Sequence, residues 1–121
     1  MRFSLDTGGG NSIQSYSDQG VVISDRVYAS SVLVTALQVE TWTPGTIADL
    51  DESHLAPLLA HQPGIVILGT GARLVFPAPR LLAGIQQHGI GVEVMANAAA
   101  VRTFNVLLSE DRPVLLALLQ G

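Results

Sequence analysis

The sequence contains no cysteine and no lysine. The absence of cysteine excludes disulfides, thiolate metal ligands and a cysteine nucleophile within these 121 residues. All six basic residues are arginines, and they are scattered along a chain of net charge −4. Nucleic acid and anionic membrane surfaces are bound by clustered basic residues. We therefore expect no nucleic-acid partner.

Long apolar runs are also missing. The longest one, Val114–Leu119, is far shorter than the roughly 20 residues that a membrane-spanning helix needs. The segment Met1–Asp6 lacks the apolar run of a signal peptide. These features predict a cytoplasmic protein without membrane insertion.

Charged residues make up only 13% of the chain, whereas 48% is hydrophobic. This apolar content is sufficient for a packed core, and the length suits a single domain over residues 1–121. The low charge leaves little with which to cover the surface. We therefore expect a protein partner, or a second copy of the chain, to cover part of it.

The N-terminal half has the pattern of β-structure. Ser12–Tyr16 alternates in polarity, a further strand starts at Val21–Ile23, and another is predicted over Ser31–Leu37. Two helix starts follow, one at Thr46 and one near Ser53. The later start is favoured because it leaves Pro57 in the first helical turn.

From Gly64 onward, strands alternate with helices. The apolar runs Ile65–Leu68 and Val114–Leu119 predict buried strands, and Gly91–Met95 is predicted as the strand between them. Helical periodicity predicts helices over residues 78–88 and 97–109. This alternation predicts a βαβ arrangement with the three strands in one sheet.

The tripeptide Gly69-Thr70-Gly71 follows a buried strand, where α/β proteins form ligand crevices. Its backbone N–H groups could approach an anion because glycine has no Cβ. A dinucleotide fingerprint is incomplete, since Leu74 occupies the third glycine position, and no P-loop lysine follows. A tight structural turn is the leading alternative, and we expect no cofactor.

Arg102 and Asn105 share one flank of the last helix. A guanidinium beside an amide could hold a carboxylate or a backbone carbonyl, although a solvated helix edge is an equal alternative. Glu93 points away from the face of its apolar neighbours, and a carboxylate is costly to bury in a sheet covered on both sides. Glu93 therefore either lies near the strand end or has a partner, and Arg102 is the natural candidate because its helix follows this strand directly. The candidate binding pocket consists of Gly69, Thr70, Gly71, Glu93, Arg102 and Asn105.

Catalytic and metal-binding patterns are weak. His54, His61 and His88 are scattered, and only Asp51 could join the first two on one face. No Gly-x-Ser-x-Gly elbow supports a serine nucleophile. We predict no metal site and assign no catalytic residue.

Four strings together resemble one family, the Mth-type domain of unknown function: Ile67–Gly71, Phe76-Pro77, Gly89–Met95 and Arg102–Leu107. The family includes mitochondrial complex I assembly factor 3 and the adipogenesis-associated Mth-domain protein. The resemblance implies a three-layer α/β fold, in which a mixed central sheet is flanked by helices and carries an additional N-terminal β layer. It implies no established enzyme activity and no required cofactor. Where many members have Asp-Thr and a cysteine, this sequence has Ala96-Asn97 and Val101.

Two classes of function follow. The first is a non-enzymatic binding or assembly-support domain that acts through protein partners, as the family's role in respiratory complex I assembly implies. The alternative is a small-molecule binder or enzyme that uses the candidate pocket. A flat apolar patch would favour the first class, and a deep polar pocket the second.

Overall fold

The computed structural model describes residues 10–121. The first three strands form an antiparallel sheet in chain order: β1 (Ile13–Ser17), β2 (Gly20–Ile23) and β3 (Arg26–Tyr28). Two-residue turns join them, which is the preferred loop length in hairpins. The second turn consists of Ser24 and Asp25, both at positive φ.

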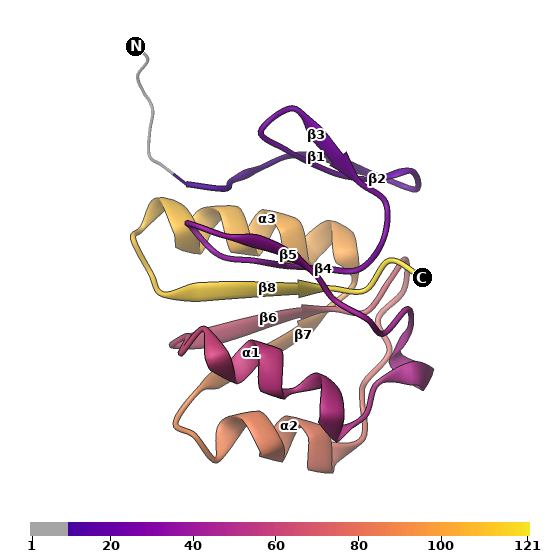
Figure 1. Cartoon of the computed structure of the whole chain (residues 1–121), viewed down its shortest axis with the longest axis vertical. Coiled ribbons are helices and arrows are strands. Elements are labelled where there is room, and N and C mark those ends of the chain that lie inside the picture. The colour runs from indigo at the N-terminus through magenta and orange to yellow at the C-terminus, as the bar shows by residue number, and fades with distance from the viewer. Residues whose placement is uncertain (1–9) are drawn as a thin grey trace.

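A second, five-stranded sheet forms the centre of the molecule in the order β5-β4-β8-β6-β7 (Figure 1). Its strands are β4 (Val32–Val34), β5 (Val39–Thr41), β6 (Ile65–Gly69), β7 (Gly91–Met95) and β8 (Val114–Leu118). Strand β6 runs parallel to β7 and β8, whereas β4 runs antiparallel to β8 and β5. The prediction that the three C-terminal strands share one sheet is therefore confirmed.

Helices cover both faces of the central sheet (Figure 1). Helix α3 (Asn97–Ser109) lies on one face beneath the N-terminal sheet, and α1 (Ala56–Ala60) and α2 (Pro79–Gln86) lie on the other. The fold is thus α/β, with a mixed sheet between helices and an additional N-terminal β layer, as the family resemblance implied. None of the helices within residues 10–121 is long and apolar enough to cross a bilayer.

The two cores follow from the alternation of side chains along the central strands. In and after β8, Leu116 and Leu118 face α3, whereas Leu115 and Leu119 face α1 and α2. Phe104 of α3 is fully buried in the core on the α3 side of the sheet. Each such side chain stabilises the fold by about 1.5–3 kcal/mol relative to an exposed position.

The N-terminal half differs from the sequence prediction in three places. Strands β3 and β5 were not predicted. The strand expected over Ser31–Leu37 is only β4, because the chain reverses at Thr35, whose N–H donates to the Gln38 carbonyl at 2.9 Å. Both proposed helix starts are used, by the short 3-10 turns η1 (Ile47–Asp49) and η2 (Glu52–His54), and Pro57 lies in the first turn of α1 as expected.

Candidate functional site

Thr70 fixes the turn that follows β6. Its hydroxyl donates to the Arg73 carbonyl at 2.6 Å and accepts from the Val75 N–H at 3.1 Å. Its own N–H donates to the Met95 carbonyl at 2.9 Å. The N–H of Gly71 donates to Oδ1 of Asn97, also at 2.9 Å. The two N–H groups expected to approach an anion are thus already satisfied inside the protein, which favours the structural-turn interpretation.

Asn97, the first residue of α3, connects the ends of two central strands. Its side chain is only 1% exposed. Besides accepting from Gly71, it donates from Nδ2 to the Leu119 carbonyl at 2.8 Å. A Cβ on Gly69 would lie 2.5 Å from Oδ1 of Asn97, so this close approach requires glycine. Sequence reasoning noted Asn97 only as a departure from the family pattern, although an amide at a helix start after a buried strand was an available signal.

Asn105 joins α3 to the N-terminal sheet. Its Oδ1 accepts from the Ile13 N–H at 2.7 Å, and its Nδ2 donates to the Ile13 carbonyl at 2.9 Å. The backbone carbonyl that this amide holds belongs to the chain itself. Asn105 therefore has a structural role whether or not it also contacts a ligand.

The predicted ion pair between Glu93 and Arg102 is absent from the described residues. Both residues are exposed, and neither takes part in the ion pairs found within residues 10–121. Glu93 does lie on the α3 side of β7, since its register partner Ile67 packs in that core. However, β7 is the outer strand of the sheet, so water solvates the carboxylate and no burial cost demands a partner.

The six residues of the candidate pocket do not line one hollow, because four are divided between two hollows and Gly69 and Glu93 line neither. Thr70 and Gly71 line a cleft of about 250 Å³ at the carboxyl ends of β6 and β8, which we call the Gly71 cleft. Arg102 and Asn105 line a groove of about 260 Å³ between β1 and α3, the β1–α3 groove. Tyr16 lines both hollows and Glu93 lines neither.

An exposed apolar segment, which sequence reasoning missed, follows the Thr70 turn. Leu74, Val75 and Phe76 are 52%, 44% and 67% exposed, and we call them the apolar loop. The Val75 N–H is bonded to the Thr70 hydroxyl, so the loop is held against the end of β6. Contiguous exposed apolar side chains of this kind are typical of interaction surfaces.

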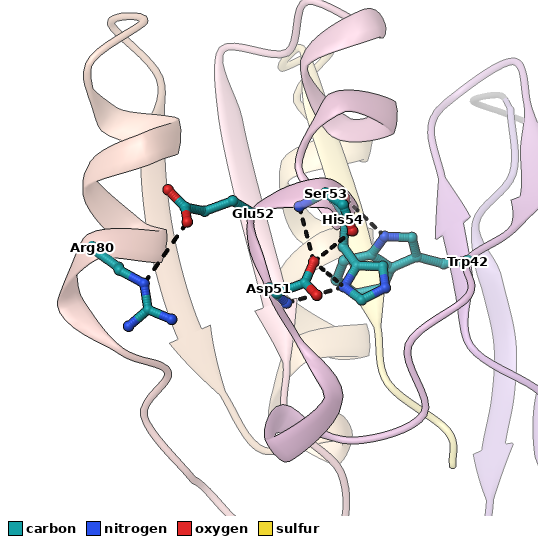
Figure 2. A network of polar contacts seen from close by, with 6 residues as sticks. All are labelled: Trp42, Asp51, Glu52, Ser53, His54 and Arg80. Atoms are coloured by element: carbon teal, nitrogen blue, oxygen red, sulfur yellow. Dashed lines mark hydrogen bonds and ion pairs between the residues drawn. The ribbon is translucent and has the colours of Figure 1, made fainter.

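A polar network surrounds η2 (Figure 2). Oδ1 of Asp51 accepts from the N–H and the hydroxyl of Ser53, and these bonds lower the pKa of the Asp51 carboxyl. The Asp51 N–H donates to Nδ1 of His54, whose carbonyl accepts from the Trp42 indole at 3.1 Å. The network links η2 to the chain after β5 and so has a structural role.

The histidines are separate from one another. His54 contacts Asp51, whereas His61 contacts Glu40 of β5 instead of sharing a face with them. Within residues 10–121, no three His, Asp or Glu side chains are grouped so that they could hold a metal ion.

The fold places this protein in the class of Mth938-like domains. A solution structure described as such a domain, from Bordetella pertussis, matches with a TM-score of 0.81 and 26% identity over 99% of this chain and 92% of its own. A crystal structure of a protein from Bordetella parapertussis matches with a TM-score of 0.87 and 28% identity, over 93% of this chain and 98% of its own.

The chain belongs to the family described as proteins of unknown function (DUF498/DUF598). The model of this family matches residues 13–119. It is 33% identical over 109 residues to NADH dehydrogenase (ubiquinone) 1 alpha subcomplex assembly factor 3 of Xenopus tropicalis. That match covers 88% of this chain and 60% of the relative. The family resemblance stated from the sequence motifs is therefore confirmed, and relatives of this chain are named as assembly factors.

Proposed function

We propose that this domain is non-enzymatic and supports the assembly of a respiratory NADH dehydrogenase by docking on a protein partner. The observation that carries the proposal is the apolar loop, Leu74–Phe76, which exposes three consecutive large side chains. Burying Phe76 alone against a partner would contribute about 1.5–3 kcal/mol. The names of the assembly-factor relatives supply the class of partner.

The Thr70 hydroxyl supports this role because it fixes the start of the apolar loop. A pre-ordered loop loses little conformational entropy when it binds, so more of its burial energy appears as affinity. The hydroxyl of Thr70 bonds to the Arg73 carbonyl and the Val75 N–H, and these bonds order the loop before a partner binds.

The test replaces the native protein in its own cells with Phe76→Ser. We expect this variant to lose most of its co-purifying NADH dehydrogenase subunits, measured by quantitative mass spectrometry, and to lower the amount of assembled complex on native gels. The matched control is Leu37→Ser, because Leu37 is 89% exposed in a different part of the surface, between β4 and β5. Equal recovery of the subunits with both variants would refute the proposal.

A small-molecule function has weaker support. The Gly71 cleft offers about 250 Å³ and polar walls, but the amide of Asn97 and the hydroxyl of Thr70 already bond within the protein. A ligand would therefore have to displace bonds that stabilise the fold.

A further inference from the structure

We propose that the β1–α3 groove binds an extended, acidic segment of the protein partner, which adds to the free edge of β1 and places a carboxylate at Arg102. The inference rests on the proposed function, because the occupant is part of that partner. It names a second contact surface, separate from the apolar loop, and the chemistry that this surface recognises.

Strand β1 is an outer strand of its sheet, so one of its edges faces away from β2. A two-residue turn closes the hairpin at the pair Ser17 and Gly20, which exchange backbone bonds. The next pair is then not hydrogen-bonded, so the N–H and carbonyl of Tyr16 point away from β2. Among residues 10–121, no backbone group outside the sheet bonds to them.

The side chain of Asn105 already bonds to this edge of β1 as a neighbouring strand would. A register irregularity between Ile13 and Ser15 brings the backbone of Ile13 to the same outer edge. The Asn105 carboxamide pairs with both groups of Ile13, at 2.7 and 2.9 Å, as the peptide group of an added strand would. An added segment would bond to the next outward-pointing backbone groups of β1, the N–H and carbonyl of Tyr16.

The β1–α3 groove lies beside that edge. The groove has a volume of about 260 Å³, and Tyr16 lines both it and the Gly71 cleft. Ala98 on the helix and Ser15 on the strand have small side chains, so a backbone can approach closely. Strand addition beside a helix is an established mode of peptide recognition, in which main-chain bonds supply affinity and nearby side chains supply specificity.

The charge of the groove favours an acidic segment. Among the described residues lining the groove, Arg102 is the only charged one, and no ion pair within residues 10–121 engages it. A guanidinium that is free to make two parallel bonds favours a carboxylate. The outer strand β7 instead carries Glu93 at its centre, where like charge would repel an acidic segment. For such a segment, the charge pattern therefore favours β1 over β7.

The test uses a blocked octapeptide of alternating valine and threonine with one central glutamate, and a second peptide with glutamine in its place. We expect the glutamate peptide to bind the protein about two- to fivefold more tightly than the glutamine peptide, as an exposed ion pair would give. In Arg102→Gln this advantage should disappear, and the glutamine peptide should bind both proteins alike. The exposed position of Arg102 allows this variant to fold, which circular dichroism checks.

Amide chemical shifts locate the binding and provide the controls. Binding should shift the amides of Ser15–Ser17 and of residues 98–105, and N-methylation of the peptide residue opposite Tyr16 should abolish it. Arg80→Gln, which removes another exposed arginine, should leave both affinities unchanged. Shifts confined to β5 or β7, or no shift of any β1 amide at millimolar peptide, would overturn the inference.

Two further outcomes distinguish this inference from self-association of the chain and from the proposed function. If Arg102→Gln converts a dimer into a monomer in sedimentation, the groove binds a second copy of the chain and the inference is wrong. If the peptides fail but Phe76→Ser still loses the NADH dehydrogenase subunits, the proposed function stands and only the groove assignment falls.

Discussion

The side-chain amide of Asn105 pairs with the backbone of Ile13, 92 positions earlier in the chain. It accepts from the N–H at 2.7 Å and donates to the carbonyl at 2.9 Å. This pairing satisfies two backbone groups on an open strand edge and fixes the N-terminal sheet over α3. Asn105 therefore ties β1 to α3 beside the β1–α3 groove.

Replacing Asn105 with alanine should destabilise the protein by about 1–3 kcal/mol, because the partly buried N–H and carbonyl of Ile13 lose their partners. Urea unfolding measures the change. Val106→Ala, at the next and exposed helix position, serves as the control and should alter stability by less than about 0.5 kcal/mol. Equal effects of the two substitutions would show that the pairing contributes little.

Gly69 and Gly91 offer a second matched comparison. A methyl group on Gly69 would lie 2.5 Å from Asn97 Oδ1 and 2.6 Å from a Leu118 methyl, whereas one on Gly91 would meet nothing nearer than 3.7 Å. Gly69→Ala should therefore cost about 1–3 kcal/mol through overpacking. Gly91→Ala should be neutral or slightly stabilising, since glycine weakens a strand. Thermal unfolding distinguishes the two, and a neutral Gly69→Ala would contradict the close packing around Asn97.

The C-terminal half could be predicted from sequence because its signals are local and strong. Continuous apolar runs identify β6 and β8, and helical periodicity gives α3 with its observed bounds, Asn97–Ser109. Strands β3 and β5 have three residues each, and the turns before them, at Ser24-Asp25 and Thr35–Gln38, contain neither glycine nor proline. Such short strands depend on pairing with their neighbours, which sequence patterns do not reveal.

The candidate site was predicted only in part, for a related reason. The junction at Thr70 and Gly71 follows from a Gly-x-Gly turn after a buried strand, and the structure places both residues in a cleft. The ion pair between Glu93 and Arg102 was predicted on the assumption that β7 is covered on both sides. The strand order instead makes β7 an outer strand of the sheet. Likewise, the exposure of Phe76 depends on which elements fail to cover it, and that is a property of the tertiary structure.

Neither NAD nor ATP should raise the melting temperature of this protein. The N–H groups of Thr70 and Gly71, which would approach a phosphate, already donate to Met95 and Asn97. A differential scanning fluorimetry series with each nucleotide at millimolar concentration measures the response. Because a ligand that binds the native state stabilises it by mass action, a reproducible rise of several degrees would show that the turn rearranges to bind phosphate.

Asp51 should titrate below the usual range for an aspartate. The hydroxyl of Ser53 and then its backbone N–H donate to the carboxylate and lower its pKa. Because the folded pKa lies below the unfolded one, the native state binds fewer protons. The contribution to stability is therefore present above about pH 4 and is lost as the pH falls through the folded pKa.

The substitution Ser53→Ala tests the cause of this shift, because it removes the hydroxyl bond and keeps the backbone bond. We expect the pKa of Asp51, followed by NMR of its side-chain carboxyl carbon, to rise toward the ordinary value without reaching it. Ser109→Ala is the control, since that hydroxyl donates to the Val106 carbonyl in α3 and is not bonded to Asp51. The variant Asp51→Asn should lack the acid-induced loss of stability that Asp51 contributes, because it has no titrating carboxyl at this position. An unchanged pKa in Ser53→Ala would show that the hydroxyl bond does not persist in solution and would assign the shift to the backbone N–H alone.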